Sequence, residues 1–224
     1  MVSTARAAQV GTELLILYHF NQDNFMAHET SKSKELRTER NHFLKYFVGE
    51  GLDIGAGDDP LETPYGNVAT YDMTQGNANY LSIIDDGTYD FVYSSHCLEH
   101  MPDVPLAIRH WARVLKPGGI LYITVPDWML YEHKHWPSIF NLDHRATFSV
   151  SVPRSEVDGR KNHYHVWEDL LPIFRANRMQ ILDTALEDIG YDYDAPDGLD
   201  QSDSSNALCQ IRIIATKALE VVGL

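Results

Sequence analysis

The sequence predicts an α/β fold, an open and mostly parallel β-sheet whose strands are joined by crossover helices. Strand and helix patterns alternate along the chain, and this alternation favours parallel strands because they need long crossover connections. A short apolar run at residues 52–54 ends in a glycine turn. Residues 120–125 are rich in β-branched side chains and follow a helix-breaking turn. The length of 224 residues suits one domain, and an apolar fraction of 44% is enough to bury a continuous core.

The first part of the chain predicts one amphipathic helix and three strands. Apolar side chains recur near one face of residues 30–47, which indicates a helix: Leu36, Phe43, Leu44 and Phe47. Glycines at positions 49 and 51 end this pattern. Short apolar runs bounded by turn residues then predict strands at 52–54, 67–71 and 91–94.

The second part of the chain begins with a clearer helix. Asp103 can cap it, Pro105 stands in its first turn, and apolar residues recur at helical spacing: Val104, Ile108, Trp111 and Leu115. The turn at 116–119 ends the helix before the strand at 120–125. Later patterns predict a helix at 168–177 and strands at 179–187 and 207–216, separated by an Asp-rich stretch, 190–205, that we interpret as a solvated loop.

The composition excludes or disfavours several classes of protein. With 32 acidic and 18 basic residues the net charge is −14, so the field has the wrong sign for a nucleic-acid-binding protein. No apolar run approaches the roughly 18 residues of a membrane span, and the apolar stretch 14–18 is too short for a secretory core. Cys97 and Cys209 form no disulfide framework and no metal-binding spacing. We expect a reduced, cytoplasmic protein that is a monomer or a homodimer.

Glycine and aspartate residues mark a ligand crevice at the carboxyl ends of the first two strands. Gly55 and Gly57 allow a ligand to approach the backbone, although a glycine turn can also serve local geometry alone. A dinucleotide site would have a third glycine three residues on, but Pro60 stands there and Asp58 and Asp59 would repel a diphosphate. A nicotinamide or flavin enzyme is therefore the second choice, and a cationic ligand suits the turn better. Asp72 can accept both hydroxyls of a ribose or can cap a turn.

Four motifs in sequence order resemble those of class I S-adenosylmethionine-dependent methyltransferases. They are LDIGAG at 52–57, TYD at 70–72, YDFVYSSHCLEH at 89–100 and LKPGGIL at 115–121. The third motif is similar to that of the methyltransferase type 11 subgroup. The resemblance implies a Rossmann-like, doubly wound sheet with a late antiparallel strand, S-adenosyl-L-methionine as methyl donor and S-adenosyl-L-homocysteine as product. It also implies a methyltransferase domain at 49–224, with residues 1–48 as an N-terminal helical cap.

The resemblance assigns cofactor-binding roles by position. The methionine and ribose part would meet the glycine turn and the end of the second strand: Asp53, Gly55, Ala56, Gly57, Asp72 and Met73. Asn77 and Ala78 stand where the family binds adenine, and Ser95 and His96 would face the methyl donor, with residues 98–100 turning away into the next helix. The chain departs from the family twice. Asp59 replaces a glycine, and the stretch 73–88 is too short for a full helix and a third strand.

An irregular segment, 127–165, is dense in histidine and aromatic residues and is expected to form a substrate lid. A hydroxyl acceptor must lose its proton, which an imidazole near neutral pKa can accept. We therefore expect His144, next to Asp143, and His100 to be catalytic, although His144 could instead fasten the loop through a backbone carbonyl. Imidazoles at 133, 135 and 144 could ligate zinc, but without cysteines and on an open loop we expect no metal.

The sequence pattern of the lid also indicates the kind of acceptor. Its pattern YEH at 131–133, WPS at 136–138 and DH at 143–144 is similar to one in methyltransferases encoded among bacterial surface-polysaccharide genes. That likeness implies O-methylation of a sugar, a glycan or another small molecule. Two alternatives stay open, methylation of a quinone-type aromatic metabolite and a non-catalytic protein that binds S-adenosylmethionine. We expect a small-molecule or glycan acceptor and no nucleic acid.

Overall fold

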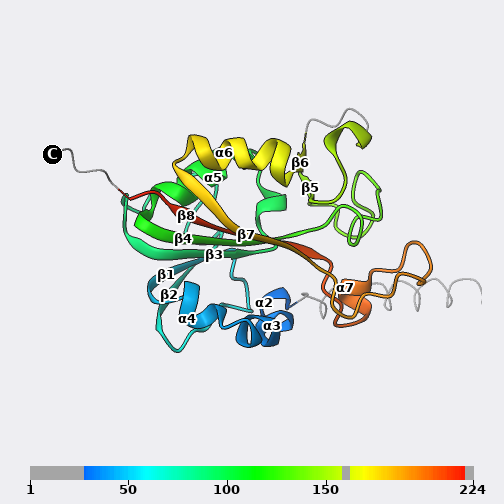
Figure 1. Cartoon of the computed structure of the whole chain (residues 1–224), viewed down its shortest axis with the longest axis horizontal. Coiled ribbons are helices and arrows are strands. Elements are labelled where there is room, and N and C mark those ends of the chain that lie inside the picture. The colour runs from blue at the N-terminus through cyan, green and yellow to red at the C-terminus, as the bar shows by residue number, and fades with distance from the viewer. Residues whose placement is uncertain (1–27, 158–161, 220–224) are drawn as a thin grey trace, which may run out of the picture.

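A computed structural model describes residues 28–157 and 162–219; the apolar stretch 14–18 and most of the expected N-terminal cap lie outside these ranges. The chain forms a six-stranded sheet in the order β2-β1-β3-β4-β8-β7 (Figure 1). Its strands are β1 (Gly49–Ile54), β2 (Gly66–Tyr71), β3 (Tyr89–Ser95), β4 (Leu115–Pro126), β7 (Met179–Glu187) and β8 (Gln210–Lys217).

Strand pairing confirms the predicted sheet. β2, β1, β3 and β4 run parallel to one another, whereas β8 is antiparallel to both of its neighbours, β4 and β7. β4 begins at Leu115, five residues before the predicted strand, because the Pro-Gly-Gly turn is absorbed into the strand beside a register shift between Tyr89 and Phe91. Residues 72–88 contain turns but neither helix nor strand, so the sheet ends at β2 and the crossover is abbreviated as expected.

One face of the sheet carries the helices α5 (Val104–Arg113) and α6 (Leu171–Ala176) (Figure 1). The Asp103 carboxylate accepts a hydrogen bond from the Leu106 amide at 2.9 Å and caps α5 as predicted. The apolar stripe of α5, including Ile108 and Trp111, is buried in the main core. α6 is preceded by one π-helical turn, η3 (Val166–Leu170), so this helical stretch starts two residues earlier than predicted.

The opposite face is covered by three short helices where one helix was predicted at 30–47. These are α2 (Glu29–Lys32), α3 (Lys34–Glu39) and α4 (His42–Tyr46). Asn41 adopts a left-handed conformation with φ of 58°, which interrupts the helix between α3 and α4. Most of the predicted apolar face packs inward, since Phe47 lies against the rings of Phe91 and Tyr122 beneath the sheet. Leu44 was wrongly placed on this face: it is 52% exposed, because the break at Asn41 changes the face that α4 presents to the core.

The irregular segments gather beyond the carboxyl ends of the parallel strands (Figure 1). They include η1 (Leu98–His100), η2 (Arg154–Glu156), the two-stranded sheet of β5 (Thr147–Ser149) and β6 (His163–His165), and α7 (Gln201–Ser204). α7 lies within the Asp-rich stretch that the sequence predicted as a loop. None of the helices in the described ranges has the length and apolar character needed to cross a bilayer. The topology thus places loops from four parts of the chain around one end of the sheet.

Candidate active site

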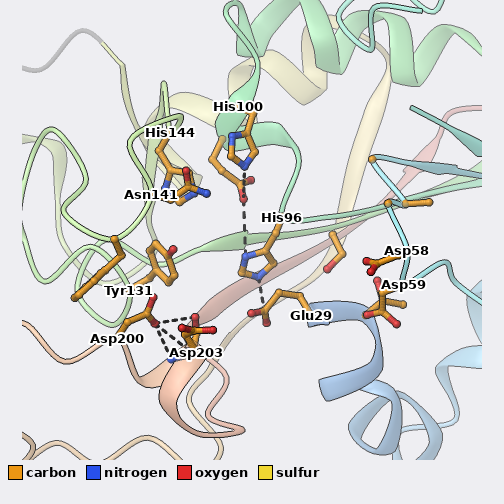
Figure 2. A pocket seen from close by; sticks show the side chains of 18 residues that line it. Glu29, Asp58, Asp59, His96, His100, Tyr131, Asn141, His144, Asp200 and Asp203 are labelled. Carbon is orange, nitrogen blue, oxygen red and sulfur yellow. Dashed lines mark hydrogen bonds and ion pairs between the residues drawn. The ribbon is translucent and has the colours of Figure 1, made fainter. Parts of the chain in front are cut away.

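A cavity of about 450 Å³ lies beyond the carboxyl ends of β1 and β3. Its walls come from α2, from the glycine turn, from the segment after β3, from the lid and from the region of α7. Seven of the predicted site residues line it: Gly55, Ala56, Gly57, Ser95, His96, His100 and His144. Figure 2 shows Asp58 and Asp59 on one side of the cavity, Tyr131, Asn141 and His144 on the other, and His96 between them.

The glycine turn has a backbone conformation that favours glycine. Gly55 and Gly57 have φ angles of 78° and 53°, in the left-handed region that residues with a side chain adopt only rarely. A Cβ on Gly55 would lie 2.6 Å from Cβ and Sγ of Cys97, whereas a Cβ on Gly57 would meet nothing within 4 Å. Gly57 therefore leaves bare backbone at the cavity wall, where a ligand can approach closely. This cradle fits a nucleoside with a positive sulfonium group, because the neighbouring acidic side chains oppose phosphate.

Asp53 and Asp72 support the turn from behind and do not line the cavity. Oδ2 of Asp53 accepts a hydrogen bond from the Leu61 amide at 2.7 Å, and burial raises the pKa of Asp53 to about 7. Oδ2 of Asp72 accepts from the Gly57 amide at 3.0 Å. Asp72 thereby ties the end of β2 to the turn after β1, which is where the sequence places the ribose.

The other three predicted cofactor residues also lie outside the cavity walls. Met73 is 94% exposed. The side-chain oxygen Oδ1 of Asn77 accepts a hydrogen bond from the Asn79 backbone amide at 2.8 Å, and the Ala78 backbone carbonyl accepts from the indole nitrogen of Trp111 at 2.9 Å. Asn77 stands where the family binds adenine, and an adenine contact through its side-chain oxygen would compete with this local turn.

His96 stands between the two sides of the cavity in a left-handed conformation with φ of 50°. Its Nε2 lies 2.9 Å from Oε1 of Gln210, whose amide nitrogen donates to Glu187 at 2.7 Å. Because Glu187 fixes the orientation of the Gln210 amide, Nε2 of His96 is the hydrogen-bond donor. Beside it, the Ser95 hydroxyl accepts from Thr124 at 3.0 Å. The sequence contained no local signal for Gln210 or Glu187, because both lie on the late strands.

His144 and His100 each have a carboxylate at Nδ1. Nδ1 of His144 lies 2.6 Å from Oε1 of Glu132, and Nδ1 of His100 lies 3.2 Å from Oδ2 of Asp143. Asp143, the sequence neighbour of His144, thus pairs with the other imidazole. Burial lowers the pKa of His144, but the hydrogen bond to Glu132 and the nearby charge of Glu99 outweigh it and raise the pKa overall. The bond to a side chain differs from the expected alternative of a backbone carbonyl.

Glu99 is a wall residue that the sequence did not indicate. We expected residues 98–100 to turn away from the cavity, but the single turn of η1 places Glu99 and His100 in its wall. Glu99 is fully buried, and neither carboxylate oxygen has a hydrogen-bond partner among the described residues. Its Oε1 lies 3.8 Å from Nδ1 of His96 and 3.8 Å from Nε2 of His100.

The cavity is acidic, since its described lining contains no lysine or arginine. Six of the lining residues are carboxylic acids: Glu29, Asp58, Asp59, Glu99, Asp200 and Asp203. Asp200 caps α7 by accepting hydrogen bonds from the Ser202 and Asp203 amides. Part of the Asp-rich stretch is therefore helical and lines the cavity. Of the imidazoles considered as zinc ligands, only His144 lines the cavity, and His135 is exposed.

Comparisons with known proteins identify the relatives of this chain. Residues 25–167 match a protein family that is described as a methyltransferase domain. The ubiquinone/menaquinone biosynthesis C-methyltransferase UbiE of Vibrio vulnificus is 32% identical over 94 residues, which is 42% of this chain and 35% of that protein. The chain therefore matches about a third of the length of this curated relative.

Solved structures share the fold. One lies in the complex of the Haloferax volcanii Trm112 methyltransferase activator and its methyltransferase, with 15% identity, coverage of 85% of this chain and 94% of that chain, and a TM-score of 0.50. Another is described as a sarcosine dimethylglycine methyltransferase from Galdieria sulphuraria, with 14% identity, coverage of 82% and 84%, and a TM-score of 0.50. At these identities the likeness is one of fold.

Proposed function

Since the chain belongs to the methyltransferase domain family, we propose that it transfers the methyl group of S-adenosylmethionine to a hydroxyl group of a sugar, a glycan or another small molecule. One observation carries this proposal. The glycine turn and the imidazoles of His100 and His144 line one cavity, with His96 between them. A donor bound at the turn and an acceptor bound at the imidazoles would therefore meet inside the cavity.

The donor half is built from the end of β1 and its neighbours. Gly57 offers backbone without a side chain, and Asp72 holds the turn through the Gly57 amide. The sulfonium group of the donor is positive, so Asp58 and Asp59 at this side of the cavity favour it by charge. The same carboxylates disfavour a dinucleotide, whose pyrophosphate would meet negative charge.

The lid and η1 line the half of the cavity that would hold the acceptor. When bound, S-adenosylmethionine supplies a methyl carbon for in-line displacement; positioning the acceptor oxygen near it lowers the barrier by several kcal/mol. A hydroxyl must also lose its proton, and an imidazole can accept it; His100 and His144 are the imidazoles of the lid and η1 that line the cavity, which supports this role for them. Tyr131 and Asn141 complete this half with groups that can hydrogen-bond to a polar acceptor.

The lining chemistry favours a neutral acceptor. Because no lysine or arginine lines the described cavity, a phosphorylated acceptor would find carboxylates instead of cations. A neutral sugar or glycan fits this lining, in agreement with the lid pattern that resembles methyltransferases encoded among surface-polysaccharide genes. The partial identity to UbiE supports a second candidate, methylation of a quinone-type aromatic metabolite.

A transfer assay with labelled methyl groups tests this proposal. The protein is incubated with methyl-labelled S-adenosylmethionine and separate pools of neutral oligosaccharides, nucleotide sugars, and phenols or quinols. We expect label in the neutral oligosaccharide pool, and no label with the His144→Ala variant. Label in the phenol or quinol pool alone would support the second candidate. A protein that binds S-adenosylmethionine but labels no pool would be a non-catalytic binding protein and would contradict our proposal.

A further inference from the structure

Three side chains at the acceptor end of the cavity form a set of metal-ligand type. Glu99, His100 and His144 each offer one ligand atom, and these atoms all lie within 4.8 Å of one another. Glu99 and His100 are neighbours in η1, and the fold brings His144 of the lid to them. Two imidazoles and one carboxylate are a ligand set of catalytic zinc sites, in which a fourth position stays open. The set shares only His144 with the zinc ligands considered from the sequence.

The carboxylate of Glu99 supplies an independent indication. Glu99 is 0% exposed, and both of its oxygens lack a hydrogen-bond partner among the described residues. The nearest imidazole nitrogens, Nδ1 of His96 and Nε2 of His100, lie 3.8 Å from Oε1, beyond hydrogen-bond distance. Leaving a buried carboxylate without hydrogen bonds is unfavourable, and such groups in native proteins are normally hydrogen-bonded or bound to metal. A cation between Glu99 and the two imidazoles would satisfy it.

The outer contacts of both imidazoles fit the same arrangement. Nδ1 of His144 is bonded to Glu132, and Nδ1 of His100 faces Asp143, so Nε2 of each ring is the nitrogen left for a ligand role. Nε2 of His100 lies 3.8 Å from Oε1 of Glu99. Metal-binding histidines commonly donate their second ring N–H to a carboxylate, which fixes the tautomer and the ring orientation. Both rings are thus paired with a carboxylate at Nδ1, as the histidines of metal sites commonly are, and a buried carboxylate, Glu99, lies beside them.

We propose that Glu99, His100 and His144 bind a divalent transition-metal ion, such as zinc, with one coordination position open to the cavity. The role of the ion rests on the proposed function. An acceptor hydroxyl that occupies the open position releases its proton to water at the cavity mouth. Its oxygen then bonds to the methyl carbon while the carbon–sulfur bond breaks, and the electron pair stays on sulfur. His100 and His144 thus activate the hydroxyl as ligands of the ion.

Metal binding is measured directly, without any acceptor. Full-length protein is freed of metal with a chelator and titrated with Zn²⁺ in competition with a chromophoric chelator, and the free energy of unfolding of each variant confirms its fold. We expect one ion for each chain. Glu99→Gln keeps the shape of the side chain and should weaken Zn²⁺ binding more than tenfold, and Glu132→Ala should weaken it about 10- to 100-fold. His135→Ala, which removes an exposed lid imidazole, should bind Zn²⁺ like the parent.

Two results would overturn the metal site. One is parent protein that takes up no Zn²⁺, and the other is a folded Glu99→Gln variant that binds it as tightly as the parent. Asp200→Ala tests whether Zn²⁺ binds instead to the acidic wall of the cavity. If this variant lost Zn²⁺ binding and Glu99→Gln kept it, the ligands named here would be wrong. Calorimetry with S-adenosylmethionine on the metal-free protein keeps the two proposals distinct. Donor binding without Zn²⁺ uptake would remove the metal site and leave the proposed function intact.

Discussion

Nδ1 of His144 lies 2.6 Å from Oε1 of Glu132, and both side chains are nearly fully buried, with exposed fractions of 3% and 1%. The pair joins two points of the lid that are twelve residues apart. It holds the His144 ring in one orientation and leaves the opposite ring nitrogen for chemistry. Asp143, the nearer acidic residue in the sequence, is 69% exposed and faces His100. The acceptor end of the cavity thus depends on contacts made by the folded lid.

Replacing Glu132 by Ala should lower the rate of methyl transfer about 10- to 100-fold, because the His144 ring loses the carboxylate that orients it. Steady-state assays with the acceptor found by the labelling screen measure this change. Glu132→Gln should retain more activity, since its amide oxygen can still accept from Nδ1. His135→Ala is the matched control and should behave like the parent. Equal rates for Glu132→Ala and the parent would show that the pair has no role in transfer.

Replacing Asp72 by Ala should weaken binding of S-adenosylmethionine by about 1–3 kcal/mol through lost charge-assisted hydrogen bonds. Two effects add in this variant, because the carboxylate also accepts from the Gly57 amide and holds the turn. Isothermal titration calorimetry measures the affinity, with Asp85→Ala, an exposed carboxylate, as control. Unchanged affinity in Asp72→Ala would mean that the ribose lies elsewhere.

The two glycines of the turn should respond differently to substitution by Ala. Gly55→Ala places Cβ against Cys97 and in a left-handed conformation, so we expect a loss of roughly 2–4 kcal/mol in the free energy of unfolding. Gly57→Ala meets no neighbour and should lose only about 1–2 kcal/mol. Its methyl group enters open space at the cavity wall, so it should lower donor affinity. Urea unfolding and calorimetry separate the two effects. A Gly57→Ala variant with full donor affinity would contradict this account of the turn.

Asp53 should make the protein less stable as the pH rises. Burial raises the pKa of Asp53 to about 7 from 3.8 in the unfolded chain. Between these values the native state binds more protons than the unfolded state, so the free energy of unfolding falls with rising pH, by at most about 4 kcal/mol. Asp53→Asn removes this dependence, and its amide oxygen can still accept from Leu61. Urea unfolding at pH 5 and pH 8 measures it, with Asp85→Asn as control. Parallel stability curves for Asp53→Asn and the parent would contradict the shift.

Much of the sheet was predictable because its signals are local. The glycine turn after β1 and the run of β-branched residues in β4 are short sequence patterns, and each is typical of one kind of local structure. The break of the N-terminal helix was not predictable, because Asn41 adopts its left-handed conformation within a periodic apolar pattern. That pattern still placed Phe47 correctly in the core.

In the candidate site, too, some features were predictable from local sequence and others were not. The residues of the glycine turn line the cavity, and the turn itself was predictable because neighbouring residues determine a turn at a strand end. Glu132 and His144 are twelve residues apart and meet only in the folded lid, so the sequence did not indicate their pairing. Glu99 is the sequence neighbour of His100, but its place in the cavity wall depends on the turn of η1. The role of Asn77 stays a prediction; its side-chain oxygen accepts a hydrogen bond from the Asn79 amide, a local contact that the sequence did not indicate.

The central claim is that the turn at Gly55–Gly57, with Asp72 behind it, holds S-adenosylmethionine. The most direct measurement is isothermal titration calorimetry of the folded parent protein with S-adenosylmethionine and, separately, with a nicotinamide dinucleotide. Our account predicts saturable binding of one S-adenosylmethionine per chain and no binding of the dinucleotide. Folded protein that binds only the dinucleotide, or neither ligand, would contradict it.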